Sequence, residues 1–300
     1  MIKPVELRRE FRISFDGVAT NTLDVWRTLV AARTGDSGTL RTLVTAQPIL
    51  ACCKYNYAPP LHFAVREGHV DVVGYLIGNG GFFRQYRSDF FLDSFVAMAR
   101  ERGHETIASM LEAVERDPTL AAPCVAPTDD MRIEIPDHEK RERFLELISA
   151  GSLRDVESAI EADPSLTTDP YQCWGEGVLA VPCNAGDRER VELLLRAGAR
   201  VPEVTKWCAR YYFKHLHIAS ILMEHGMNAN HMNWHHVTLL HEVAFAGDIA
   251  KATLLLDHGA AIDAVDEEYR TTPLGLAVRG KQDAMVRFLL DRGADAGVLS

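Results

Sequence analysis

The sequence predicts an all-α fold made of repeated helical hairpins. Two related phrases near the C-terminus carry this prediction, each followed by a glycine-alanine pair. They are Thr238-Leu-Leu-His241-Glu-Val-Ala244 with Gly259-Ala260, and Thr272-Pro-Leu-Gly-Leu-Ala277 with Gly293-Ala294. A helix pair that recurs about every 33 residues cannot bury its apolar face alone, so neighbouring pairs stack into an elongated solenoid with one concave face.

Each hairpin has a short first helix and a longer second one. In the segment 57–81, Pro59 and Pro60 stand where a first helical turn tolerates proline, because its N–H groups have no intrahelical acceptor. Gly68 then separates this helix from a second one, in which Val70, Val73 and Leu76 recur at helical spacing. Glycines close the second helices, where the chain needs a left-handed residue: Gly80, Gly198, Gly226, Gly259 and Gly293.

These phrases, together with Pro60-Leu-His-Phe-Ala64, resemble the repeat of ankyrin proteins. The resemblance implies an ankyrin-repeat solenoid of about eight helix-turn-helix units with short projecting loops, covering most of the chain. The expected units are residues 24–50, 57–81, 90–118, 141–164, 174–200, 204–228, 235–261 and 269–295.

Three segments depart from the repeat. Residues 204–228 replace the small-residue phrase by bulky side chains from Trp207 onward, so the register there stays open. The prolines at 118, 123, 127 and 136 mark an insertion that is either a lid or a linker, in which 131–135 alternates like a short strand. The expected domains are a capping segment 1–22, a first array 23–118, the insertion 119–140 and a second array 141–300.

Composition excludes several classes of function. A net charge of −10 argues against sequence-independent nucleic-acid binding, which needs a basic surface. No apolar stretch is long enough to span a bilayer, so no membrane association is expected, and charges among the first ten residues argue against a secretory signal. Six cysteines without paired spacing predict free thiols and a cytoplasmic location.

The last helix leaves apolar side chains, among them Val286, Phe288 and Leu289, without a following repeat. The protein is therefore expected to be a monomer or an end-to-end dimer. No glycine-rich phosphate loop follows a strand, and no cofactor is expected.

Aromatic and polar residues gather at the loop tips that precede the first helices. Aromatic rings beside hydrogen-bonding side chains are typical anchors at interfaces, although rings of this kind also pack on neighbouring tips. The main prediction is non-catalytic recognition of a protein or peptide on the concave face. The predicted binding residues are Tyr55, Tyr57, Tyr86, Tyr171, Trp174, Trp234, His235, His236, Tyr269 and Arg270.

The alternative is an enzyme, or a receptor for a small molecule, between the tips 171–174, 234–236 and 267–270. In that case His235 or Glu268 would serve as general base, and Tyr269 or Arg270 would stabilise developing charge. The enzyme question stays open, and the interpretation leans toward binding because polar tips usually serve recognition.

Histidines suggest a metal site as a further hypothesis, with His231, His235 and His236 as candidate ligands. Neighbouring residues of an extended segment point to opposite sides, so His235 and His236 would need an irregular turn to share one metal. His241 aligns with His62 in the repeat phrase, where the resemblance implies a structural imidazole that hydrogen-bonds the backbone of the next unit.

Overall fold

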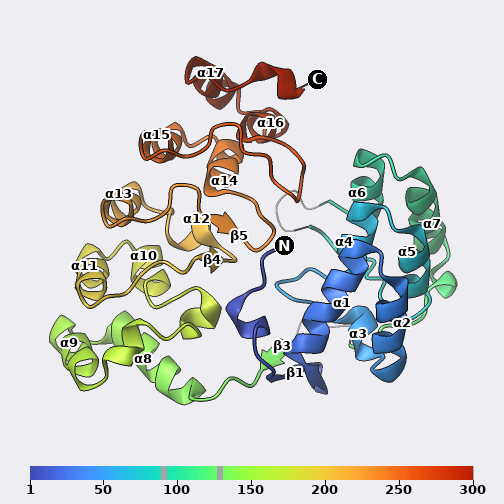
Figure 1. The fold of residues 1–300 in the computed structure, drawn as a ribbon, viewed down its shortest axis with the longest axis horizontal. Coiled ribbons are helices and arrows are strands. Elements are labelled where there is room, and N and C mark those ends of the chain that lie inside the picture. Colours follow the sequence, from blue (N-terminus) through green and yellow to red (C-terminus); the bar gives the residue numbers. More distant parts are fainter. Residues whose placement is uncertain (89–92, 127–130, 300) are drawn as a thin grey trace. The chain divides into compact units, whose positions relative to one another are not determined.

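The structure is a computed structural model that describes residues 1–88, 93–126 and 131–299. Its chain divides into two compact units. One unit, called here the C-terminal unit, comprises Met1–Glu6 and Pro136–Ser300. The other, called the N-terminal unit, comprises Leu7–Ile135. Both are mostly helical, as an all-α repeat fold requires (Figure 1).

The N-terminal unit is a stack of helix pairs. They are α1 (Thr22–Thr34) with α2 (Ser37–Ala46), α4 (Pro60–Glu67) with α5 (Val70–Ile77), and α6 (Phe95–Glu101) with α7 (Glu105–Arg116). First helices contact one another in the order α1, α4, α6, and second helices in the order α2, α5, α7. Short helices α3 (Ile49–Cys52) and η2 (Pro118–Leu120) follow α2 and α7.

Glycine–histidine contacts join successive pairs of this unit. Gly35 ends α1 in the left-handed conformation, with φ of 72°, and His69 of the next pair packs on it and bonds the Arg33 carbonyl at 2.8 Å. A Cβ at Gly35 would lie 2.6 Å from the His69 ring, so the approach needs glycine. Gly68 and His104 repeat the arrangement one pair further along.

A three-stranded antiparallel sheet, in the order β2-β1-β3, completes the N-terminal unit. Its strands are β1 (Arg12–Phe15), β2 (Val18–Asn21) and β3 (Met131–Ile133), with Ile13 opposite Ile133. The strand expected within 131–135 is therefore present. Pro127 of the insertion and residues 90–92 of the expected third unit lie outside the described residues.

The C-terminal unit has the same architecture of stacked helix pairs. Its pairs are α8 (His138–Ala150) with α9 (Leu153–Ala162), α10 (Ala180–Ala185) with α11 (Arg188–Arg196), α12 (Cys208–Tyr211) with α13 (Leu216–Glu224), α14 (Leu239–Ala246) with α15 (Ile249–Asp257), and α16 (Pro273–Arg279) with α17 (Asp283–Asp291). The first helices contact one another in chain order from α8 to α16 (Figure 1).

Short elements fill the connections of this unit. They are the 3-10 helices η1 (Val5–Leu7), η3 (Pro164–Thr167), η4 (Gln172–Gly175) and η5 (Ala296–Leu299), and the two-residue strands β4 (Val204–Thr205) and β5 (Met232–Asn233), which pair in parallel. Of these, η1 ends at Leu7, the first residue of the N-terminal unit.

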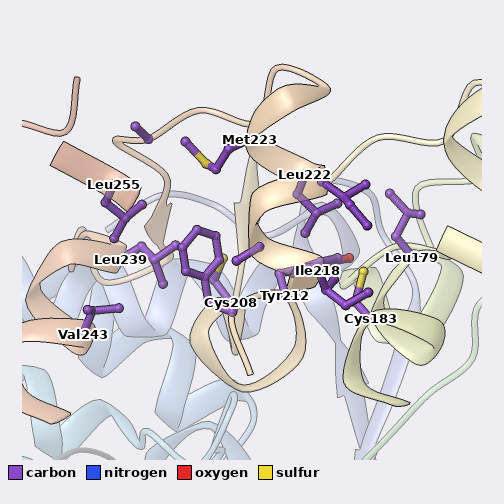
Figure 2. Close-up of a cluster of buried hydrophobic side chains, with 14 of the residues drawn as sticks. Leu179, Cys183, Cys208, Tyr212, Ile218, Leu222, Met223, Leu239, Val243 and Leu255 are labelled. Atoms are coloured by element: carbon purple, nitrogen blue, oxygen red, sulfur yellow. The ribbon is translucent and has the colours of Figure 1, made fainter. Parts of the chain in front are cut away.

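One hydrophobic core runs through the C-terminal unit. Cys208 and Tyr212 lie between Cys183 and Leu222 on one side and Leu239 on the other (Figure 2). The bulky residues of the segment 204–228 therefore fill core positions, and its α12 and α13 take the places of a helix pair in the stack.

The six cysteines are all free thiols, as their spacing predicts. Within the described residues, none of the helices is both long and apolar enough to cross a membrane.

Candidate functional site

The loop tips of the C-terminal unit form a connected series, called here the tip surface, which comprises residues 171–177, 204–207, 232–237 and 266–271. The first of these tips bends sharply at consecutive left-handed residues. Cys173, Trp174 and Gly175 have φ of 48°, 57° and 75°. Left-handed backbone costs an L-residue about 1–2 kcal/mol, and here it carries an indole whose side chain is 50% exposed.

Lys206, at the second tip, connects the first tip to residues near the N-terminus. Its backbone N–H donates to Glu176 Oε1 at 2.6 Å. Its ammonium donates to the Glu6 carboxylate and to the Trp174 carbonyl. The Lys206 side chain is therefore held between two carboxylates and a carbonyl, with the Glu176 carboxylate 3.8 Å from Nζ.

Carboxyl groups are numerous around this lysine. Glu6 and Glu176 are buried, and desolvation raises the pKa of Glu176 while the Lys206 charge opposes the rise. Glu242, half-buried on α14, has its pKa raised to about 8, first by burial and then by the Glu176 charge. The Tyr212 hydroxyl donates to the Glu176 carbonyl and anchors this tip to the core.

The third and fourth tips are shaped by side chains that accept backbone hydrogen bonds. Asn233 Oδ1 accepts from the N–H groups of His235, at 2.9 Å, and Val237, at 3.1 Å. Asp266 accepts from the N–H groups of Tyr269 and Thr271 in the same way. Such Asx-type contacts define both turns locally.

Two imidazole–carboxylate contacts join these tips. His235 Nδ1 lies 2.6 Å from Glu268 Oε2, and His236 Nδ1 lies 2.6 Å from Glu267 Oε1. The structure thus brings His235 and Glu268 together, as the enzyme hypothesis requires. A carboxylate in this position can orient an imidazole and stabilise its protonated form.

His241 has the structural role implied by the repeat phrase. Its Nδ1 lies 2.7 Å from Thr238 Oγ1 and its Nε2 lies 3.0 Å from the Thr271 carbonyl of the next repeat. Burial lowers the pKa of His241 to about 4, so the ring is neutral and can accept from the hydroxyl while it donates to the carbonyl. The prediction that this imidazole braces neighbouring units is confirmed.

The three histidines proposed as metal ligands each contact a different residue. His231 Nε2 lies 2.8 Å from Thr205 Oγ1, and burial lowers the pKa of His231 to about 4. His235 and His236 contact Glu268 and Glu267. The structure therefore places His235 and His236 in two separate imidazole–carboxylate pairs, and His231 beside Thr205, rather than bringing the three imidazoles together.

Aromatic residues predicted to bind a partner differ widely in exposure. In the C-terminal unit Trp174 is exposed, whereas Trp234 is buried and packs edge-on against the His235 ring. Tyr171 and Tyr269 are half-buried beneath the guanidinium groups of Arg141 and Arg279, and Arg270 is exposed with φ of 53°.

The remaining predicted residues belong to the N-terminal unit. Tyr55 is buried in a bridge with Ala58, and Tyr57 is 57% exposed with φ of 67°. Tyr86 stacks on Phe95, with ring centroids 4.3 Å apart, and its hydroxyl lies 2.6 Å from His62 Nδ1.

Sequence reasoning did not single out Glu6, Glu176 or Lys206. Glu6 stands in a segment that matches no repeat, and Lys206 stands in the divergent unit. The two residues are 200 positions apart, and no spacing rule connects them.

Stacked helical hairpins with projecting tips define a helical repeat protein. Residues 206–299 match the family model for ankyrin repeats in three copies, and residues 56–81 match the model for a single ankyrin repeat. The chain therefore contains ankyrin repeats in both units. Ankyrin repeats generally mediate protein–protein interactions. No curated protein matches the chain at a significant level.

Proposed function

We propose that this ankyrin-repeat protein recognises a protein or peptide without catalysis, on the concave face of a solenoid of about eight repeats. Aromatic and polar residues at the loop tips would serve as anchors. The expected cap 1–22, arrays 23–118 and 141–300 and insertion 119–140 are part of this proposal.

The observation that carries the proposal is the backbone conformation of large residues at the loop tips. Trp174, His236 and Arg270 have left-handed φ of 57°, 63° and 53°, as does Tyr57 in the N-terminal unit. Glycine adopts this conformation without steric strain. Large side chains placed there are strained, and such strain is typical of binding sites. We infer that the tips present these side chains for contact with a partner.

The experiment starts from peptides selected on the pure protein from a displayed library. Affinity of one selected peptide is then measured for the wild type and for Trp174→Ala. We expect at least a tenfold loss, equivalent to about 1.4 kcal/mol, because exposed tryptophans are frequent interface hot spots. Leu290→Ala, which truncates an exposed side chain on α17, is the matched control. Equal affinity for wild type and Trp174→Ala would refute the aromatic-anchor proposal.

One observation favours the second candidate, an enzyme or small-molecule receptor. The His235–Glu268 contact of 2.6 Å lies beside Tyr269 and Arg270 in sequence and could place a general base. A cavity of about 290 Å³ elsewhere in the unit is lined by Leu195, Arg200 and His231, and by none of these four residues. The observation that supports the catalytic candidate is therefore the imidazole–carboxylate pair rather than this cavity.

A thermal-shift screen against divalent metals, organic acids and common metabolites tests this second candidate. A ligand that binds the folded state raises its melting temperature. Stabilisation of the wild type that is lost in His235→Ala would support it. Equal stabilisation of both proteins would place the ligand elsewhere.

The cytoplasmic location and the monomeric or end-to-end dimeric state also belong to the proposal. Cell fractionation tests the first. Light scattering across a concentration series tests the second, with dimerisation through α17 expected to fail in Phe288→Glu.

A further inference from the structure

Residues 1–6 lie along the tip surface of the C-terminal unit. The Ile2 N–H donates to the Trp234 carbonyl at 2.8 Å, and the Glu6 carboxylate accepts from the Lys206 ammonium. Pro4 and Glu6 are buried. We propose that residues 1–6 act as an internal ligand, and that the partner of this surface is an extended peptide with an acidic side chain in the place of Glu6. The proposal rests on the proposed function, because it names the partner class of the same surface.

The place of the Glu6 carboxylate is closely shaped by the chain. Lys206 Nζ approaches it from one side, and Gly175 approaches it from another. A Cβ at Gly175 would lie 2.9 Å from Glu6 Cδ and Oε2, closer than real Cβ contacts allow. Gly175 also needs its left-handed φ of 75°, so two independent constraints favour glycine there. The tip is thus built to admit a carboxylate at close range.

Charge makes this position selective for an acid. The Lys206 side chain is largely buried, and the Glu176 carboxylate, at 3.8 Å, is beyond hydrogen-bond distance from its ammonium. Removing Glu6 takes away the carboxylate that accepts from a poorly solvated ammonium, and breaking a buried ion pair on one side is strongly destabilising. A peptide that replaces residues 1–6 must therefore bring its own carboxylate.

The backbone supplies the second part of the recognition. The Trp234 carbonyl, directly after β5, accepts from Ile2 in the manner of a strand partner. Extended peptides commonly bind by such main-chain hydrogen bonds, with side-chain pockets adding specificity. The spacing between Ile2 and Glu6 defines the expected motif: an amide that meets Trp234, and an acidic residue four positions later. The Trp174 carbonyl accepts from the same Lys206 ammonium that donates to the acid.

Residues 1–6 compete with the partner peptide because they occupy the same surface and belong to the same chain as that surface. A tethered segment has an effective concentration on the order of millimolar at its own site. An added peptide must displace it, so the apparent affinity of the wild type is lower than that of a chain whose own segment is weakened. Glu6→Gln weakens the segment while it conserves the side chain's volume.

The probe is an acetylated, fluorescein-labelled peptide with the sequence of residues 1–8, Met-Ile-Lys-Pro-Val-Glu-Leu-Arg, measured by fluorescence anisotropy against full-length protein. Acetylation removes any contribution of an α-amino group. We expect the Glu6→Gln chain to bind the peptide at least tenfold more tightly than the wild type. The same peptide with glutamine at its sixth position should bind the Glu6→Gln chain at least tenfold more weakly than the unchanged peptide.

The substitution Lys206→Met should also abolish binding of the labelled peptide. The control Lys214→Met removes an exposed lysine bonded to Asn184 and should leave peptide binding unchanged. The peptide substitution keeps the test decisive if Lys206→Met fails to fold. Absence of binding to the Glu6→Gln chain, or equal affinity of the two peptides, would overturn the inference. Library-selected peptides that still require Trp174 would then leave the proposed function standing, whereas failure of both tests would reject both.

Discussion

The repeats α12–α13 and α14–α15 occupy successive places in one stack but are held together differently. In the regular repeat, Thr238 hydrogen-bonds His241, whose imidazole reaches the Thr271 carbonyl of the next repeat. In the divergent repeat, Thr205 and Cys208 stand at the matching positions. The link to the next tip comes instead from Thr205 Oγ1, which lies 2.8 Å from His231 Nε2, and from the pairing of β4 with β5.

Large buried side chains also stabilise the divergent repeat. Tyr212 and Phe213 are fully buried, and the Tyr212 hydroxyl bonds the Glu176 carbonyl. The tip is then available for a charged residue, Lys206, which meets Glu6. The repeat that departs from the phrase is therefore the one whose tip binds the Glu6 carboxylate.

The largest expected effect comes from charging the shared core. Ala244 on α14 is fully buried and packs in the hydrophobic core of the unit. Ala244→Asp should lower the free energy of unfolding by about 4 kcal/mol, because a buried carboxylate without a partner is strongly unfavourable. Chemical denaturation measures the change. Ala246→Asp, on the exposed face of the same helix, is the control and should change stability by less than about 0.5 kcal/mol.

Exchanging the brace tests the comparison directly. His241→Cys gives the regular repeat the residue of the divergent one and leaves the Thr271 carbonyl without its imidazole donor. We expect a loss of about 2–3 kcal/mol from the cavity and the missing hydrogen bonds. His258→Cys, at an exposed position where the imidazole bonds the Leu254 carbonyl of its own helix, is the control. A loss below about 0.5 kcal/mol would mean that the brace contributes little.

The Glu242 carboxyl should make stability depend on pH. Its folded pKa, about 8, lies above its ordinary value of 4.5, so the folded state keeps a proton that the unfolded state releases. Stability from this group is complete below pH 4.5 and falls as pH rises toward 8. Glu242→Gln should therefore stabilise the protein by roughly 2 kcal/mol at pH 9 and have little effect at pH 4. Denaturation curves of the wild type and Glu242→Gln at both pH values test this direction of the pH dependence. Stabilisation by Glu242→Gln at pH 4 and not at pH 9 would contradict the prediction.

Two buried histidines oppose this trend at acid pH. Burial lowers the pKa values of His231 and His241 from 6.5 to about 4, so the unfolded state takes up protons first and stability falls as pH drops through that range. As the pH rises from this acid range, the stability lost through the histidines should return by the same amount in the wild type and in Glu242→Gln. This shared response separates the contribution of the histidines from that of Glu242.

The smallest expected effect on stability concerns the strained tip. Trp174→Gly relieves the left-handed strain, while glycine adds conformational entropy to the unfolded chain. The two nearly offset, so thermal denaturation should show a change within about 1 kcal/mol. A loss above about 2 kcal/mol would show that the indole is a packing residue rather than an exposed anchor.

Much of the helical repeat could be predicted because its signals are local. The phrases at 60–64, 238–244 and 272–277 begin α4, α14 and α16 within a residue or two, since proline, threonine and glycine act on the backbone beside them. The divergent repeat lacks such a phrase. Its core residues, Cys208 and Tyr212, are recognisable only from the helices that pack around them.

The candidate site was predictable only in part. The sequence indicated that tips carry aromatic residues, yet Trp174 is 50% exposed and Trp234 is 1% exposed. Both stand among polar residues before a first helix, so nothing local distinguishes them. Residues on neighbouring tips decide which ring packs, and the sequence does not reveal those contacts.

By itself, the sequence determined the repeat, its helices and its turns, because these depend on hydrogen bonds and backbone angles set by residues a few positions apart. Tertiary structure alone decided that Lys206 meets Glu6, that Gly175 makes room for this carboxylate, and that neighbouring segments desolvate the Glu242 carboxyl. Burial and charge pairing depend on side chains from distant segments, and only the folded chain brings them within reach.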